Sequence, residues 1–96
     1  TGYPVPKRAD RNQPEITRAL RQVGATVQHL HTVGQGCPDL LVGYHGLNYL
    51  LEIKDWMQRP SQQKLTLAED LWHADWRGQV PIVKNVEEPL KLIGAI

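Results

Sequence analysis

Two apolar segments joined by a glycine-containing turn constrain the fold of this chain most. Residues 39–44 (DLLVGY) and 47–54 (LNYLLEIK) are rich in strand-forming residues, and His45-Gly46 between them is a plausible tight turn. If the hairpin turns there with a four-residue loop at 44–47, Asp39 lies opposite Glu52, with their Cβ atoms about 4.5–5.5 Å apart. Lys54 shares this face because strand side chains alternate. A three-residue loop would shift the register by one residue.

The predicted pairing of Asp39 with Glu52 has a chemical consequence. Two neighbouring carboxylates repel each other unless a positive charge lies between them. Mg²⁺ suits such a site, since it binds one or two carboxylates and keeps several waters. Lys54 would then orient the attacking water or stabilise the developing charge, as in metal-assisted phosphodiester hydrolysis. The alternative is that Asp39 begins a strand near a turn, while Glu52 and Lys54 form an exposed, ion-paired face.

The rest of the chain predicts a single α/β domain over residues 12–96, after an extended basic arm over residues 1–11. Capping-box spacings at Asn12-x-x-Glu15 and Thr66-x-x-Glu69 each predict the start of a helix. The first helix ends at Gly24, and the second runs to about Arg77, is capped by Gly78 and has the inner face Ala68, Leu71, Trp72 and Trp76. Further predicted elements are a strand at 25–30, a loop at 34–38, an edge strand at 80–84 and a last helix at 86–93.

The formal net charge of +1 argues against a strongly basic nucleic-acid binder, but the charges are unevenly distributed. Residues 1–35 carry a surplus of positive charge, and residues 36–96 carry a surplus of negative charge. The candidate phosphate contacts in the basic third are Lys7, Arg8, Arg11, Arg18 and Arg21. No apolar run is long enough for a membrane span or a signal peptide, so we expect a cytoplasmic protein.

At the hairpin the chain resembles a known nuclease family. Pro38-Asp39, followed by Glu52-Ile53-Lys54, is similar to the PD-(D/E)XK signature. The segment GCPDLLVGYHGLNYLLEIKDW resembles the VRR-Nuc (virus-type replication–repair nuclease) branch of that superfamily. The likeness extends through NQPEITRALRQVGA upstream and KLTLAEDLWHADWRGQVPIVKNVEE downstream, which together span roughly residues 10–93.

This resemblance implies a restriction-endonuclease-like αβββαβ core with a central mixed sheet flanked by helices. It implies that Asp39, Glu52 and the backbone carbonyl of Ile53 bind Mg²⁺ or Mn²⁺, with Lys54 catalytic and Glu15 as the helical acidic residue. It also implies a DNA endonuclease of a bacterial or phage-infected cell, which acts as a homodimer on branched DNA in the manner of a Holliday-junction resolvase. A non-catalytic DNA-binding or assembly module on the same fold, and a flap or single-strand nuclease, are the alternatives.

Several residues allow two interpretations. Glu15 could be only the capping partner of Asn12, and Glu69 is explained as the capping partner of Thr66. Relatives often carry a glutamine in the first turn of the second helix, where this chain has Glu69 and Asp70; Gln62 and Gln63 lie just before it. Trp56 is a core, dimer or DNA contact. Cys37 is expected to be a small loop residue and not a nucleophile, and His29 and His31 are expected to share a partly exposed strand face and not to bind a metal.

Overall fold

The predicted hairpin forms the centre of the sheet. In the computed structural model, which describes residues 11–96, β2 (Leu40–Tyr44) and β3 (Leu47–Ile53) pair antiparallel. Their register runs from Tyr44 opposite Leu47 to Leu40 opposite Leu51, as predicted for a turn at His45-Gly46. His45 (φ 50°) and Gly46 (φ 81°) both adopt the left-handed conformation that a two-residue type I′ turn requires. The register on which the site prediction depends is therefore confirmed.

Two further strands complete a mixed sheet in the order β1-β2-β3-β4. β1 (Thr26–His29) is antiparallel to β2, and β4 (Ile82–Val83) is parallel to β3 at the opposite edge. The helical elements are α1 (Gln13–Gln22), η1 (Pro60–Gln62), α2 (Leu67–Asp75) and α3 (Glu87–Leu92). This α/β order resembles an αβββαβ core, as expected. No helix in the described part of the chain is long and apolar enough to cross a membrane.

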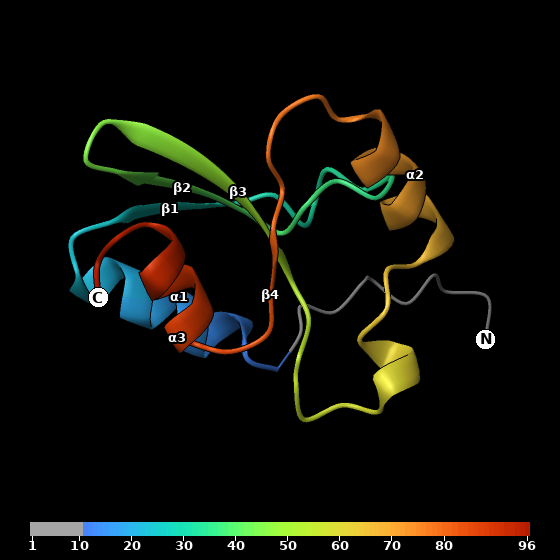
Figure 1. Cartoon of the computed structure of the whole chain (residues 1–96), viewed down its shortest axis with the longest axis horizontal. Helices are drawn as coiled ribbons and strands as arrows, with labels where there is room; N and C mark the ends of the chain where they lie inside the picture. The colour runs from blue at the N-terminus through green and yellow to red at the C-terminus, as the bar shows by residue number, and fades with distance from the viewer. Residues whose placement is uncertain (1–10) are drawn as a thin grey trace.

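The helices lie on different sides of the sheet (Figure 1). α1 and α3 lie together against one face, and α2 stands apart from them at the other end of the molecule. The core lies beneath α1, because alternate residues of the strands point towards that helix. The buried apolar side chains of this core include Ile16, Leu20, Leu40, Val42, Leu51 and Ile53. The intervening residues of β3, Leu50 and Glu52, therefore project from the opposite face.

The predicted capping box at the start of α1 is wrong. Asn12 adopts a helical conformation (φ −83°, ψ −4°), and its side chain caps no backbone N–H. Its buried Nδ2 instead donates to the carbonyl oxygens of Lys54 (3.2 Å) and Lys84 (3.0 Å). The reason is tertiary: Lys54 directly follows β3 and Lys84 directly follows β4, so the amide joins α1 to the two parallel strands.

The predicted inner face and end of the second helix are also wrong. The helix ends at Asp75 and not near Arg77, and its C-cap is Trp76 and not Gly78. Leu71 is 63% exposed and Trp76 46% exposed, and Ala68 is exposed as well. The capping box of Thr66 and Glu69 is confirmed. The helix turns its polar side towards the sheet because Glu69 and a neighbouring histidine have buried partners there.

Candidate active site

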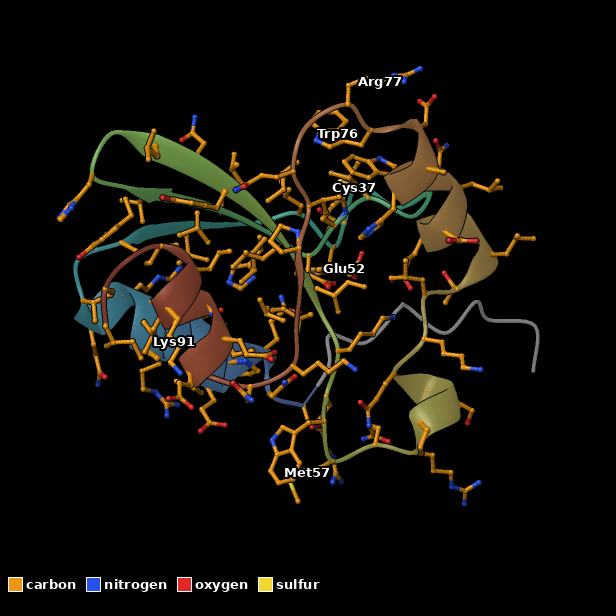
Figure 2. All side chains as sticks on the ribbon, viewed as in Figure 1. Cys37, Glu52, Met57, Trp76, Arg77 and Lys91 are labelled. Atoms are coloured by element: carbon orange, nitrogen blue, oxygen red, sulfur yellow. The ribbon has the colours of Figure 1, made fainter. Side chains whose placement is uncertain are left out.

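The end of β3 places two of the predicted site residues on the face opposite the core. Ile53 is buried in the core, so the alternation of the strand turns Glu52 and Lys54 to the α2 side. Beyond Leu51 the strand leaves β2 and pairs with the β4 segment, since Glu52 N donates to Pro81 O and Lys54 N to Val83 O, both at 3.0 Å. Figure 2 shows Glu52 in the middle of the molecule, between α3, which carries Lys91, and the end of α2. The predicted residues therefore sit where the sheet divides.

Asp39 lies immediately before β2 and reaches the same place. Its N–H donates to the carbonyl oxygen of Leu51 (3.0 Å), the residue before Glu52. The regular β2–β3 pairing therefore ends at Leu40 and Leu51, and Asp39 lies just beyond it. Its Oδ2 accepts a hydrogen bond from Ile53 N at 2.7 Å. A backbone amide thus fixes the orientation of the buried Asp39 carboxylate beside Glu52. The predicted juxtaposition of the two carboxylates is present in the structure.

Glu52 is in an environment that opposes its negative charge. Its side chain is fully buried, and this burial, followed by the neighbouring Asp39 and Glu69 carboxylates, raises the pKa of Glu52 to about 10. Its Oε1 lies 3.1 Å from His73 Nε2, while its buried Oε2 has no hydrogen-bond partner. Burial also lowers the pKa of His73, so this contact joins two neutral groups near pH 7. When Glu52 ionises, its Oε2 has no hydrogen-bond partner to stabilise the negative charge.

Lys54 is buried as well, which excludes the alternative of an exposed, ion-paired strand face. Its Nζ lies 2.8 Å from Glu69 Oε1, and the Glu69 side chain is only 1% exposed. Glu69 Oε1 also accepts a hydrogen bond from Thr66 N, so one carboxylate both caps α2 and binds the lysine. An ammonium group has three donors, so two N–H groups of Lys54 remain for other acceptors.

Glu69 and His73 are site residues that the sequence did not assign. They lie four residues apart on α2 and therefore share one face of the helix. The capping box accounted fully for Glu69, and His73 had no visible partner in the sequence. The signal available in the sequence was the i, i+4 spacing of these two polar residues, which places them on one face of the predicted helix.

The donor set fits a hard divalent cation. Two carboxylates, one of them with an unpartnered buried oxygen, are the ligands that Mg²⁺ and Mn²⁺ prefer, and the carbonyl of Ile53 lies between Glu52 and Lys54 in the chain. Within residues 11–96, no group of three His, Cys, Asp or Glu side chains is arranged to hold a metal. A cation here would therefore use two carboxylates and complete its shell with backbone oxygen and water.

The other predicted residues lie outside this cluster. Glu15 is exposed on α1, and it has no hydrogen bond or ion pair with another described residue. Arg11, Arg18 and Arg21 are exposed, as expected for phosphate contacts, and Lys7 and Arg8 lie outside the described residues, as does most of the predicted arm. Trp56 is 58% exposed, which removes the core alternative for it.

Comparisons with known proteins add no family to this description. No family model, curated protein or solved structure matches the chain.

Proposed function

We propose that the protein is a divalent-metal-dependent endonuclease that hydrolyses phosphodiester bonds in DNA. The observation that carries this proposal is the buried pair of Asp39 and Glu52 beside Lys54, with Glu52 Oε2 left without a partner. Burying two adjacent carboxylates costs free energy unless a proton or a cation is held between them; without metal the proton on Glu52 fills this role near pH 7, and a divalent cation would replace it. The resemblance to PD-(D/E)XK nucleases assigns the same three residues to catalysis.

Each residue of the cluster has a role in this proposal. Asp39, Glu52 and the Ile53 carbonyl would hold Mg²⁺ or Mn²⁺, which supplies an acidified water and neutralises charge on a phosphoryl oxygen. Lys54 donates hydrogen bonds to the attacking water or to the phosphate. Glu69 fixes the position of Lys54 through its hydrogen bond to Nζ. His73 contacts Glu52 Oε1 and so orients the Glu52 carboxyl, as residues that contact metal ligands do in metal sites.

The proposed substrate is branched DNA, and the proposed active form is a homodimer. Two copies related by a two-fold axis would present identical centres to two strands, which suits paired cuts across a junction. The exposed arginines of α1, Arg18 and Arg21, are proposed to contact phosphates on the opposite side of the sheet from the carboxylate cluster.

A cleavage panel tests the proposal. Four-way junction, flap, plain duplex and single-stranded DNA are incubated with Mn²⁺ or Mg²⁺ and with the intact protein. We expect metal-dependent cleavage that falls by at least about 100-fold in Lys54→Ala, since Lys54 acts on the reacting groups. Lys91→Ala is the matched control, because Lys91 is an exposed lysine on α3 and pairs with Glu87 at 3.2 Å. Absence of cleavage on every substrate, or cleavage that survives Lys54→Ala, contradicts the proposal.

Metal binding separates the enzyme from a non-catalytic module. For the enzyme we expect Mn²⁺ to raise the thermal midpoint of the intact protein and Asp39→Ala to abolish that shift. A DNA-binding module that has kept only the fold would bind DNA equally well with and without Mn²⁺ and would show no Mn²⁺-dependent shift.

A further inference from the structure

A second cavity lies on the other side of the sheet from the carboxylate cluster. It occupies about 680 Å³ between α1 and β1, within the range of small-molecule sites. Its walls are two adjacent rows of α1 side chains, His29 of β1, and His31, which lies in the turn after β1 and so does not share a strand face with His29 as predicted. His29 pairs in register with Leu40, a core residue, so it projects from the face opposite Glu52. The cavity is therefore separate from the candidate active site.

Three residues that line this cavity carry buried polar atoms without partners. Gln13 is 2% exposed and Thr17 4% exposed, yet Gln13 Oε1 and Thr17 Oγ1 have no hydrogen-bond partner. His31 Nδ1 is also buried without a partner. The Gln13 amide donates from Nε2 to His29 Nδ1 at 3.1 Å, which fixes Oε1 as the unpaired acceptor. Buried polar groups in folded proteins are rarely left unsatisfied, so three around one cavity indicate a bound polar partner.

The rim of the same cavity is cationic. Arg18 and Arg21 line it, and among residues 11–96 no acidic residue does. Within residues 11–96, neither arginine forms an ion pair; Arg21 makes only a 3.5 Å contact to Val27 O. Guanidinium groups bind phosphate with two parallel hydrogen bonds, so an anionic phosphate suits this rim.

We propose that the α1–β1 cavity binds a nucleotide, with the phosphate on Arg18 and Arg21 and the base against Gln13, Thr17 and His31. The base edge of a nucleotide offers both donors and acceptors, which the Gln13 acceptor, the Thr17 hydroxyl and the His31 nitrogen together require. An inorganic anion would leave Gln13 Oε1 unpaired, and an apolar ligand would leave all three atoms unpaired. This inference does not depend on metal binding or on cleavage by the opposite face.

NMR titration of the full chain, with EDTA present, tests the proposal. The probes are deoxyadenosine and deoxycytidine 5′-monophosphates, the corresponding nucleosides and inorganic phosphate. We expect saturable shifts at the amides of α1 and β1 with at least one nucleotide. The matching nucleoside and inorganic phosphate should each bind at least about tenfold more weakly, because each satisfies only part of the cavity. Equal affinity for phosphate and nucleotide, or no saturable binding of either nucleotide, overturns the proposal.

Two variants distinguish recognition from folding. Thr17→Val keeps the shape of the side chain and removes the unpaired hydroxyl, so it should raise the thermal midpoint of the unliganded protein and weaken nucleotide binding about fivefold or more. Arg18→Gln should weaken binding of the nucleotide but not of the nucleoside. Arg77→Gln is the control: Arg77 is an exposed arginine beyond α2, far from α1 (Figures 1 and 2), and its loss should leave binding unchanged. Nucleotide affinity unaltered by Thr17→Val and Arg18→Gln overturns the proposal.

A competition arm identifies the source of the nucleotide. If a short single-stranded DNA displaces the mononucleotide from the α1 and β1 amides, the cavity accepts an unpaired nucleotide of a strand. If it does not, the cavity is a site for free nucleotides. Both results support the nucleotide assignment, and shifts confined to α2 residues overturn it.

Discussion

Glu52 illustrates how one residue can connect folding with ligand binding. Its pKa of about 10 keeps the carboxyl protonated in the folded, metal-free protein near pH 7, whereas in the unfolded chain it ionises near its ordinary value of 4.5. The folded state therefore holds one more proton than the unfolded state between these two pH values. Because a divalent cation must displace this proton, the affinity of the proposed site for Mn²⁺ should increase as the pH rises.

The free energy of unfolding of the metal-free protein should consequently fall with pH. The folded state binds the extra proton, so the contribution of Glu52 declines by up to about 1.4 kcal/mol per pH unit above pH 4.5. Glu52→Gln removes this dependence and should stabilise the protein by up to about 3.5 kcal/mol at pH 7. Urea denaturation in EDTA at pH 6 and pH 8.5 measures both effects. A wild-type slope that persists unchanged in Glu52→Gln would show that other groups cause it.

The Lys54–Glu69 pair allows a second comparison at the residue scale. Glu69→Ala leaves a buried lysine without its carboxylate and also removes the α2 cap, so we expect a loss of about 3–5 kcal/mol in the free energy of unfolding. Glu87→Ala removes a carboxylate that is also ion-paired with lysine, but on the exposed surface, and should cost about 0–0.5 kcal/mol. Chemical denaturation of both variants checks the difference. Equal losses would contradict the buried pairing.

At the scale of elements, the position of α2 depends on the loop before β2. Gly36 has a φ of 82°, and a Cβ at this residue would overlap the backbone of Ala68 and approach Glu69 N. The loop and the first turn of α2 are thus in direct contact, and only glycine permits that contact. This packing fixes the position of the first turn of α2, and therefore the position from which Glu69 contacts Lys54.

Gly36→Ala tests the contact against a matched glycine. Gly34 also has a positive φ, of 75°, but a Cβ there would meet nothing within 4 Å. Gly34→Ala should cost about 1 kcal/mol from backbone strain alone, and Gly36→Ala about 2–4 kcal/mol because the overlap adds to the strain. Thermal and urea unfolding give both values, and similar costs for the two variants would disprove the close contact.

The elements that could be predicted from the sequence are those governed by local patterns. The β2–β3 register follows from strand alternation and the His45-Gly46 turn, and these two local features are enough to place Asp39 beside Glu52. The orientation of α2 could not be predicted, because two buried polar contacts outweigh the apolar pattern of Leu71 and Trp76. Asn12 was misassigned for a similar reason, since its partners lie 42 and 72 residues away in the chain.

At the scale of the molecule, the sheet separates two surfaces with different chemistry. One carries the buried carboxylates and α2, and the other carries the cationic cavity of α1. The proposed homodimer is tested by sedimentation of the full chain across a range of concentrations. We expect twice the mass of a single chain; a mass of one chain at every concentration would remove the dimer and leave the proposed chemistry untouched.

The Asn12 bridge also bears on how the protein is made. A ribosome releases the chain from its N-terminal end, so α1 emerges long before β4. The Asn12 amide has both of its acceptors only after Lys84 has been synthesised. The bridge from α1 to the two parallel strands therefore forms only after β4 has been translated, and a nascent fragment that ends before β4 lacks it.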